Sequence, residues 1–371
     1  MLLREVTIKG YKSISINIPL HLTLKKINVI LGANGSGKSN IISFFKMLNY
    51  MTSGSLQSFV ESNGGSQSFL HYGSKFTQNI QASLIFTSEK YHDRYDFTLS
   101  YATPDKLIIT SEEVEYKNSK ELKPIKLKLE TNFKESVLGT KQQDKTLSVI
   151  RTILANCKVY QFHDSSQTAA MRNSCPKDVD NYLQAEANNL AAFLLRIKNE
   201  YPENYNNIVS YIRLVVPQFQ DFILEPNKSG NVMLKWRDNS ASDYIFLPNQ
   251  FSDGSIRFIA LATLLLQPKR TMPSVIIIDE PELGLHPYAI TQLAEMIKEA
   301  SNNSQVIIAT QSPYLIDEFS ADDIVVVESE KDEGVSHTTL KRLKENDLKD
   351  WLVNYTISDL WDKNIIGGRP V

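Results

Sequence analysis

A run of residues near the start of the chain has the types and spacing that bind polyphosphate. It reads Gly32-Ala33-Asn34-Gly35-Ser36-Gly37-Lys38-Ser39, which fits the pattern G-x-x-x-x-G-K-[ST]. Glycines let successive backbone N–H groups turn toward a β-phosphate, and the N-terminus of a following helix favours negative charge. The Lys38 ammonium can reach the β- and γ-phosphates, and the Ser39 hydroxyl can bind Mg²⁺. The loop therefore predicts a site for a nucleoside triphosphate.

A second group, Asp279-Glu280-Pro281, directly follows the apolar run from Val275 to Ile278. A carboxylate at the carboxyl end of a buried strand can hold the water shell of Mg²⁺, which is the role we expect for Asp279. Glu280 points to the other side of the strand end, where it can orient or deprotonate a water that attacks a γ-phosphate. Two solvated acids are the alternative, and the phosphate loop in the same chain favours the catalytic interpretation.

A third group lies at the start of an apolar helical stretch. Ser252, Asp253 and Gly254 precede the run from Ile256 to Leu266, so a hydroxyl, an acid and a glycine gather at a helix N-terminus. Such a position can bind an anion. The alternative is a plain N-cap, in which Ser252 or Asp253 only satisfies free N–H groups.

The elements that must position these groups follow from hydrophobic patterning. Apolar residues from Ile27 to Leu31 before the loop, and a helical stretch from Ile41 to Leu48 after it, predict strand, loop and helix. From Phe251 onward the order of helix, strand, helix and strand is typical of a parallel α/β sheet. Short runs at Leu2 to Lys9 and Ser13 to Leu24 predict an antiparallel edge ahead of the nucleotide-binding core. A second, antiparallel sheet is predicted from runs at Gln81 to Phe86, Tyr91 to Tyr101, Leu107 to Tyr116 and Ile125 to Thr131.

Between these regions the pattern predicts loops and a helical lobe. Serine, glycine and asparagine from Ser53 to Ser68 predict a mobile loop, and the polar stretch from Lys134 to Lys145 predicts another. Apolar spacing of three to four predicts helices through most of Asp178 to Val216, divided at Pro202. No heptad pattern is sustained, so we expect no coiled-coil arms. Short strands are predicted at Val159 to Phe162, Phe222 to Glu225, Val232 to Trp236 and Tyr244 to Leu247.

With the motifs in this order, the chain resembles the ABC ATPases, and within them the SMC/RecF-like branch. The phosphate loop with Asn40, the Ser252-Asp253-Gly254 signature and the run from Glu282 to Pro287, Glu-Leu-Gly-Leu-His-Pro, carry the resemblance. It is similar to stand-alone ATPases related to RecF and to the ATPase half of the overcoming-lysogenisation-defect nucleases, several relatives of which serve in anti-phage defence. The similarity covers most of the chain, including the Trp361 to Pro370 stretch.

The resemblance implies an α/β fold: an ABC-type P-loop ATPase head with a mixed parallel sheet, an antiparallel β subdomain and an inserted helical lobe. We expect one domain over residues 1–371, with a P-loop lobe at 1–52, an antiparallel β insertion at 53–157, a helical lobe at 158–250, a signature and Walker B lobe at 251–329 and an extension at 330–371.

In that family, ATP lies between two protomers, and the signature of one closes over the γ-phosphate held by the other. The resemblance implies that Mg·ATP is bound by Asn34, Gly35, Ser36, Gly37, Lys38, Ser39, Asn40, Gln161, Ser252, Asp253 and Gly254, with Ser39, Asp279 and Gln161 at the metal. The role of Gln161 competes with that of an ordinary surface amide, and Gln57, Gln67 and Gln78 are other candidates. Asp253 adds negative charge near phosphate, which Arg257 could offset.

Gln311 lies where the family usually has histidine as its γ-phosphate switch. We expect Lys38, Glu280 and Gln311 to be the catalytic residues. An amide can donate a hydrogen bond but cannot become a cation, so hydrolysis could be slow. An ATP-gated dimeric switch is the leading hypothesis. A low-turnover, nucleotide-sensing scaffold that restrains a toxin or nuclease, and a RecF-like repair ATPase, are the alternatives.

The composition of the chain indicates which kinds of partner are expected. Lys plus Arg (40) nearly balances Asp plus Glu (42) in 371 residues, so no general basic field favours nucleic acid, and DNA remains an open partner. The longest apolar stretch, Phe258 to Leu266, is far shorter than a membrane span of roughly 20 residues. Cys157 and Cys175 have no paired zinc spacing, which indicates reduced thiols and a cytoplasmic protein. Lysines at 117, 120, 123, 126 and 128, and the group Lys341, Arg342 and Lys344, could contact phosphates, although interleaved glutamates equally favour a solvated strand surface.

Overall fold

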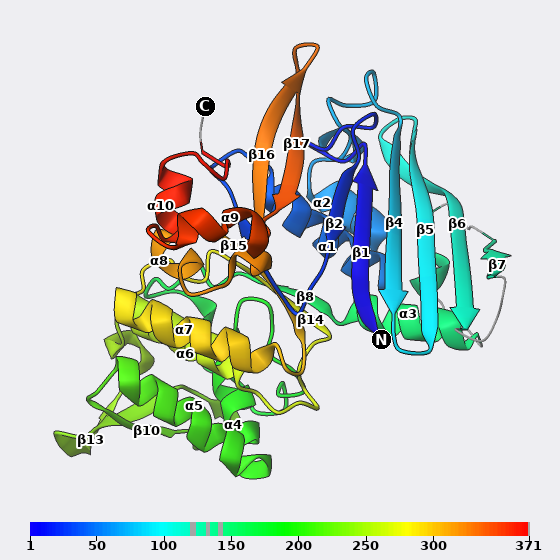
Figure 1. Cartoon of the computed structure of the whole chain (residues 1–371). Helices are drawn as coiled ribbons and strands as arrows, with labels where there is room; N and C mark the ends of the chain where they lie inside the picture. The colour runs from blue at the N-terminus through cyan, green and yellow to red at the C-terminus, as the bar shows by residue number, and fades with distance from the viewer. Residues whose placement is uncertain (119–123, 131–133, 140–143, 370–371) are drawn as a thin grey trace. The chain divides into compact units, whose positions relative to one another are not determined.

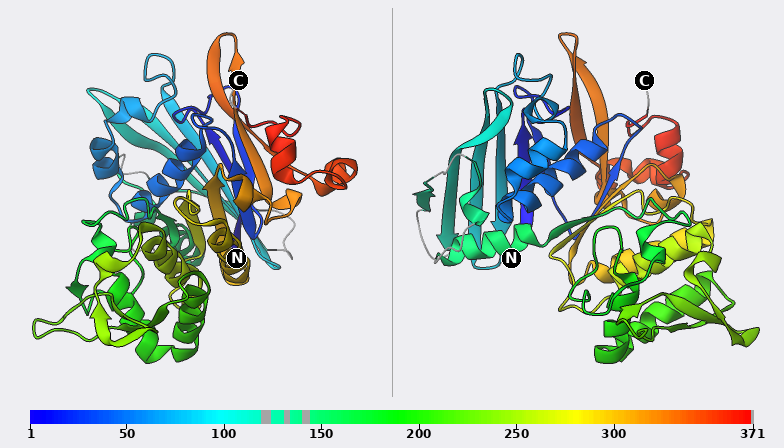
Figure 2. Two further views of the ribbon diagram at one scale, coloured as in Figure 1. Left: turned by 90° about the vertical axis from the view of Figure 1, so that its left-hand side faces the viewer. Right: turned by 180° about the vertical axis from the view of Figure 1, so that it is seen from behind.

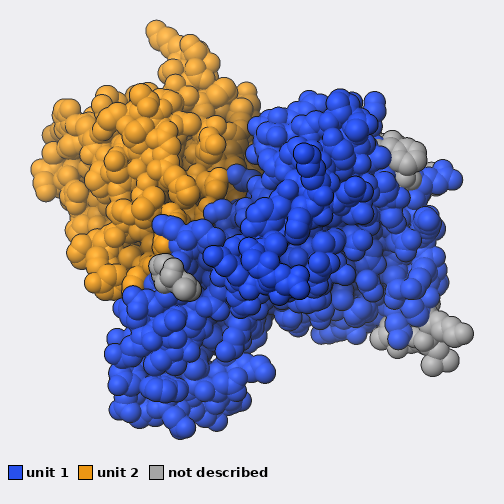
Figure 3. Space-filling view, turned by 90° about the horizontal axis from the view of Figure 1, so that it is seen from above, with its two compact units in different colours: residues 1–158, 321–371 blue, residues 159–320 orange. Residues whose placement is uncertain are grey.

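The computed structural model of the chain describes residues 1–118, 124–130, 134–139 and 144–369. Two compact units make up the fold (Figure 3): Met1–Lys158 with Ala321–Val371 form unit 1, and Val159–Ser320 form unit 2. The phosphate loop lies in unit 1, and the acidic strand end and the signature lie in unit 2.

An antiparallel sheet fills much of unit 1 (Figure 1). Its order is β2-β1-β4-β5-β6-β7. The strands are β1 (Leu2–Lys9), β2 (Leu20–Thr23), β4 (Asn79–Thr87), β5 (Tyr91–Ala102), β6 (Lys106–Asn118) and β7 (Ile125–Lys128). Alternate side chains such as Leu84, Phe86, Tyr95 and Phe97 are buried, as the period of two requires. The antiparallel sheet expected from Gln81 onward is confirmed. The expected separate edge is not formed, because β1 pairs with β4 in this same sheet and the stretch from Ser13 to Leu24 forms a strand only over β2.

Helices cover the buried face of this sheet (Figure 2). They are α1 (Lys38–Thr52), α2 (Leu56–Ser62) and α3 (Lys145–Ala155). Phe44 of α1 lies stacked over Phe97 of β5, with ring centroids 6.4 Å apart. Burial of such aromatic rings is a main source of stability for a helix against a sheet.

Two predicted loops contain regular structure. The stretch from Ser53 to Ser68 holds α2 and a 3₁₀ turn at Ser66–Ser68, because Leu56, Phe59 and Val60 are spaced to bury one helical face. The carboxylate of Glu135 accepts hydrogen bonds from the N–H groups of Leu56 (2.7 Å) and Gln57 (3.0 Å), so the second polar stretch caps α2. Residues 140–143 of that stretch lie outside the described residues. The expectation that these stretches are loops is wrong where they form α2 and 3₁₀ turns.

The rest of unit 1 is built on β3 (Ile27–Leu31), β16 (Ile324–Asp332) and β17 (Val335–Arg342). β16 pairs in parallel with β3 and antiparallel with β17. Helices α9 (Glu345–Leu352) and α10 (Ile357–Asp362) follow. The strand, loop and helix expected around the phosphate motif are formed by β3 and α1.

Unit 2 contains the second parallel pair. β14 (Val275–Asp279) lies parallel to β15 (Gln305–Thr310), and Asp279 is in register with Ala309. The helices of the unit are α4 (Leu190–Glu200), α5 (Pro202–Val215), α6 (Asp253–Leu265), α7 (Pro287–Ala300) and α8 (Pro313–Ile316). Residues 256–265 of α6 are all buried, which is typical of a helix surrounded by protein. A three-stranded sheet is formed by β10 (Phe219–Ile223), β12 (Lys235–Asp238) and β13 (Ala241–Phe246). A two-stranded sheet is formed by β9 (Cys175–Pro176) and β11 (Asn231–Val232). The strand β8 (Cys157–Tyr160) leads into the unit.

The helical lobe is shorter than its apolar pattern predicts. Residues 178–189 form turns, and the first helix begins at Leu190. The Asn189 amide is the physical reason: its Nδ2 donates to the carbonyls of Val179 (2.7 Å) and Tyr182 (2.8 Å), and its Oδ1 accepts from the N–H of Gln184 (2.9 Å). A side chain that satisfies loop backbone stabilises a non-helical path.

Helix length bears on two questions, whether the chain has coiled-coil arms and whether a helix could span a membrane. Across the residues with described structure, the longest α-helix is α1 with 15 residues, which agrees with the expectation of no coiled-coil arms. None of the helices formed by the described residues is long and apolar enough to cross a membrane.

We expect Asp93 to make stability depend on pH. This β5 residue is 5% exposed, and its Oδ1 has no hydrogen-bond partner among the described residues. Burial raises the pKa of Asp93 from 3.8 to about 6. Because the folded chain then holds the proton more tightly than the unfolded chain, stability is lost as the pH rises between about 4 and about 6. Asp93→Asn should remove this slope and raise the midpoint of thermal unfolding at neutral pH by about 2–4 °C.

Thermal unfolding monitored by circular dichroism over this pH range tests the expectation. Asp96→Asn on the same strand is the control, because Asp96 forms an exposed ion pair with Arg94 (2.9 Å) and should change the slope little. An unchanged pH slope in the Asp93→Asn protein would show that the carboxyl is not the source.

Candidate nucleotide site

The phosphate loop is wound tightly around its own lysine. Gly35 and Gly37 have φ of 82° and 111°, a region that strains other residues, and a Cβ on Gly37 would collide with Thr338. Lys38 is buried, and its ammonium donates to the carbonyls of Gly32 (2.5 Å) and Ala33 (2.9 Å). The loop thus encloses a positive charge and leads directly into the N-terminus of α1.

A chain of hydroxyls and an amide braces the loop from one side. The Asn40 side chain donates to Ser13 Oγ (2.7 Å), Ser13 Oγ lies 2.7 Å from Thr338 Oγ1, and Thr338 Oγ1 donates to the carbonyl of Ser36 (3.0 Å). Since Thr338 uses its proton on Ser36, Ser13 must donate to Thr338. Asn40, which the resemblance places at the nucleotide, thus also helps to hold the loop.

The loop residues fit a triphosphate. Asn34, Gly35 and Ser39 are exposed, whereas Ser36 is buried and its Oγ has no hydrogen-bond partner among the described residues. An unpaired buried hydroxyl is costly, and a phosphate oxygen is an acceptor that would satisfy it. The enclosed ammonium and the helix N-terminus supply the positive potential that such an anion requires.

The acidic strand end has an unusual backbone. Glu280 follows the last residue of β14 and has φ of 44°, which is uncommon for a residue with a side chain. Its N–H donates to the carbonyl of Ala309 (2.8 Å), so the conformation is fixed by the neighbouring strand. Gln311 Nε2 donates to Glu280 Oε1 (3.1 Å). The two residues that the sequence assigns to catalysis in this unit are therefore in direct contact.

Glu282 is a third, half-buried acid in the turn after this strand. Burial raises the pKa of its carboxyl, while a hydrogen bond from Thr310 (2.5 Å to Oε1) lowers it. Its Oε2 has no hydrogen-bond partner among the described residues. Glu282 thus joins the turn after β14 to the end of β15 through Thr310.

Asp279 is held by residues from the segment after β8. Gln161 Nε2 donates to Asp279 Oδ2 at 3.2 Å, and a ring nitrogen of His163 lies 3.0 Å from the Asp279 carbonyl. Gln161 is thus placed against the carboxylate expected at the metal, and Gln57 has other partners, the carbonyls of Leu107 and Lys134 (both 2.8 Å). His163 has no signal in the sequence, because one histidine beside a short strand is ordinary.

The signature stands at the N-terminus of α6. Ser252 is its N-cap: the side chain accepts from the N–H of Ser255 (3.1 Å) and remains exposed. A Cβ on Gly254 would lie 2.6 Å from the carbonyl of Gly284, so glycine permits close approach of the loop after the acidic strand. The capping role that the sequence left as an alternative is present, and the hydroxyl also faces outward.

Asp253 has a cationic partner that the sequence analysis missed. Arg172 Nη2 donates to Asp253 Oδ1 at 2.8 Å, with the Arg172 side chain 2% exposed and that of Asp253 65% exposed. The same guanidinium donates to the carbonyls of Ser165, Pro248 and Phe251. A lone arginine 81 positions before its acid leaves no local pattern to detect. The added negative charge of the signature is thus offset by a buried cation.

Arg257 interacts with Asp253 through charge, as the expected offset requires, but its hydrogen bonds go to other partners. Its guanidinium donates to the carbonyls of Phe162 (2.8 Å) and His163 (2.9 Å), to Ser165 Oγ (3.0 Å) and to the carbonyl of Leu283. The helix is thereby joined to the segment after Gln161 and to the loop after the acidic strand.

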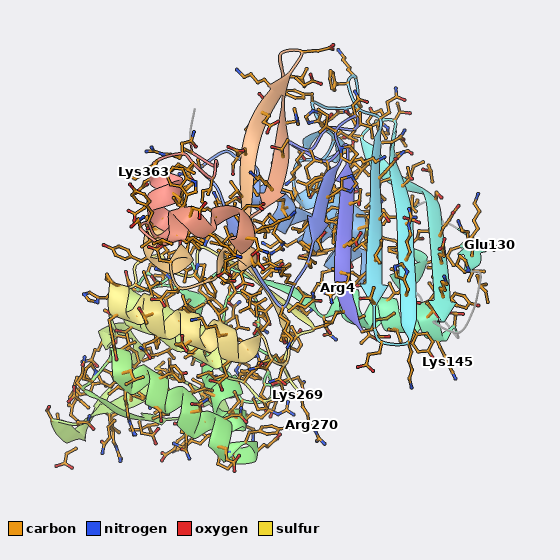
Figure 4. All side chains as sticks on the ribbon, in the orientation of Figure 1. Arg4, Glu130, Lys145, Lys269, Arg270 and Lys363 are labelled. Atoms are coloured by element: carbon orange, nitrogen blue, oxygen red, sulfur yellow. The ribbon has the colours of Figure 1, made fainter. Side chains whose placement is uncertain are left out.

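Two residues of the basic stretches have partners within the protein. Lys126 pairs with Glu115 at 3.2 Å, and Lys120 and Lys123 lie outside the described residues. Arg342 donates to the carbonyls of Asp322 and Thr23 and to Asn28 Oδ1, so it supports the fold. Figure 4 labels further cations: Lys269 and Arg270, which follow α6 in unit 2, and Lys363, which follows α10 in unit 1.

Comparison with known proteins identifies the class. The family described as "AAA domain, putative AbiEii toxin, Type IV TA system" (AAA_21) matches residues 27–317. This range includes the phosphate loop, the signature and the acidic strand end. The chain belongs to this family of ABC-type ATPases, which in general binds ATP and Mg²⁺.

Solved structures agree on the fold. An SMC head bound to the C-terminal winged-helix domain of ScpA aligns with a TM-score of 0.60 at 16% identity, covering 94% of this chain and 99% of that one. An SMC head with an extended coiled coil, bound to the C-terminal domain of ScpA from Pyrococcus furiosus, gives 0.59 at 15% identity, covering 95% and 100%. The expected ABC-type head with an SMC-like fold is confirmed.

One curated relative aligns with a smaller part of the chain. "Putative ABC transporter ATP-binding protein MG303" of Mycoplasma genitalium is 27% identical over 187 residues, which are 46% of this chain and 50% of that protein. The chain spans about half the length of this relative.

Proposed function

We propose that the chain is an ATP-gated switch: two copies close around two molecules of Mg·ATP, and hydrolysis lets them open. Closure would change a surface that engages DNA or an effector protein, and the family description associates the chain with toxin–antitoxin systems and defence. In this proposal the phosphate loop of one copy and the signature of the other complete each site.

The exposed N-terminus of α6 is the observation that carries the proposal. Ser252 is exposed beside the loop that contains Leu283 (45% exposed) and Gly284, within one unit. The helix N-terminus and its exposed hydroxyl favour an anion, and Arg172 offsets the adjacent carboxylate. These groups lie in unit 2 and face outward, as groups that serve a second copy must.

Each residue has a part in this scheme. Lys38 would bind the phosphates, and Glu280 would accept the proton of the attacking water while Gln311 orients its carboxylate. Ser39, Asp279 and Gln161 are the residues to which the motifs assign Mg²⁺, and the metal when bound would supply charge that offsets the phosphates.

A negative charge introduced at Ser252 tests whether the signature of one copy meets the phosphates bound by the other. Aspartate and asparagine both cap a helix, so Ser252→Asp and Ser252→Asn should preserve α6 equally. The carboxylate of Ser252→Asp would meet the partner's γ-phosphate, and we expect it to abolish ATP-dependent dimers while the monomer binds ATP as before. Ser252→Asn should reduce dimerisation far less.

Light scattering with ATP, in proteins that also carry Glu280→Gln to prevent turnover, measures the result. Titration with fluorescent ATP checks that each monomer retains its affinity. Dimers formed equally well by the aspartate and asparagine proteins would contradict a role for the signature at the partner's phosphate.

A low-turnover, nucleotide-sensing scaffold is the second candidate. The Gln311 amide at 3.1 Å from Glu280 favours it, because a neutral donor at this position cannot stabilise phosphate charge as a cation would. Phosphate release measured with and without linear DNA distinguishes the two. DNA-stimulated turnover supports the switch, whereas tight ATP binding with negligible turnover supports the scaffold.

A further inference from the structure

The first turn of the phosphate loop is bonded to a segment from the opposite end of the sequence. The Ala33 N–H donates to the carbonyl of Gly368 at 2.9 Å, and both residues are buried in unit 1. Figure 1 shows the chain after α10 returning to the loop that follows β3. The Ala33 amide is thus satisfied within the protein, which leaves phosphate binding to the N–H groups later in the loop.

The Gly367–Gly368 segment is held by β16. Glu328 Oε1 accepts from the Gly368 N–H at 2.7 Å. Both glycines have positive φ, 84° and 83°, and a Cβ on Gly368 would lie 2.8 Å from Val326 Cγ1. Side chains other than hydrogen therefore do not fit this path without displacement. Ile366, 4% exposed, anchors the segment from the preceding residue.

Two hydrogen bonds from other segments therefore hold the backbone of the phosphate loop. Thr338 bonds the Ser36 carbonyl, and Gly368 bonds the Ala33 N–H. Fixing Ala33 and Ser36 limits the backbone conformations of the residues between and after them. A loop whose N–H groups are already directed toward the phosphates loses less conformational freedom when ATP binds.

We propose that the Gly367–Gly368 segment, held by Glu328, is a positioning element for the phosphate loop and raises its affinity for ATP. The proposal rests on the proposed function, because it concerns binding at that site. Glu328 and Gly368 act through Ala33.

Gly368→Ala and Gly334→Ala form a matched pair. Gly334 has φ of 84°, nearly that of Gly368, but a Cβ there meets nothing within 4 Å. Both substitutions carry the same backbone strain, and only Gly368→Ala should displace the segment. We expect Gly368→Ala to weaken binding of fluorescent ATP about tenfold, because it breaks the hydrogen bond from the Ala33 N–H that orders the loop. Gly334→Ala should leave the affinity for fluorescent ATP within about twofold of the parent.

Glu328 supplies an independent test with a rescue. Glu328→Ala removes the acceptor for the Gly368 N–H, whereas Glu328→Gln retains an Oε1 at the same position. Hydrogen exchange of the peptide that contains Ala33, measured without nucleotide, should become faster in Glu328→Ala and remain slow in Glu328→Gln. ATP affinity should follow the same order, which a general loss of stability would not produce.

The outcomes separate the inference from the function on which it rests. A parent chain that does not bind ATP contradicts the proposed function and the inference together. Binding that requires Lys38 but is equal in the parent, Gly368→Ala and Glu328→Ala proteins contradicts the inference alone. Unchanged exchange at Ala33 in Glu328→Ala would do the same.

Discussion

Replacement of Glu280 by glutamine is expected to abolish ATP turnover while leaving ATP binding intact, and so to trap a dimer. Glu280 occupies the strained position after β14, with φ of 44°, and the Gln311 amide holds its carboxylate at 3.1 Å. Strain of this kind persists where the surroundings fix it, often at functional sites. Glutamine has the same shape but cannot accept the proton of water. Since general-base catalysis contributes about 10²–10⁴-fold, turnover should fall by at least about 100-fold.

The trapped dimer is the more informative result. If hydrolysis opens the two copies, its loss should leave them closed for as long as ATP is present, and light scattering should report twice the monomer mass. Removal of Mg²⁺ by EDTA should return the protein to monomers. Glu295→Gln on α7, an exposed change of the same chemistry beside Lys298, is the control and should behave as the parent. A Glu280→Gln protein that stays monomeric with ATP would count against the switch.

Replacement of Lys38 by alanine is expected to remove nucleotide binding altogether. The Lys38 ammonium is buried and lies on the carbonyls of Gly32 and Ala33, so the loop is built around its charge. Charge-assisted hydrogen bonds are worth about 1.5–3 kcal/mol each, and loss of contacts to two phosphates should weaken ATP binding at least about 100-fold.

Fluorescent ATP titration measures this loss, with circular dichroism to check the fold. Lys46→Ala on the same helix is the matched control, because it removes an equal charge outside the phosphate motif. Binding by Lys38→Ala that equals the parent would show that the loop does not hold the nucleotide.

The phosphate loop and acidic strand end could be predicted because their chemistry is local. Lys38 follows Gly37 directly, and Asp279 ends an apolar run, so neighbouring residues carry the signal. The partners of these groups come from distant parts of the chain. The bonds from Arg172 to Asp253 and from Thr338 to Ser36 depend on tertiary contacts that no spacing reveals.

Errors in the fold prediction have a similar origin. Polar composition hid α2, whose helical face is set by Leu56 and Phe59 and whose N-terminus is capped by Glu135 from another segment. Apolar spacing before α4 indicated a helix, but the Asn189 side chain satisfies the backbone of a loop there. In each case several hydrogen bonds between one side chain and backbone groups of a loop or of another segment outweighed local preference.

The bonds of Arg257 have a mechanical consequence for unit 2. One guanidinium joins α6 to the backbone at Phe162 and His163 and to the backbone at Leu283. If a second molecule binds the N-terminus of α6, as proposed, we expect any displacement of the helix to move both attached stretches with it. Separating them would break several hydrogen bonds to a buried cation.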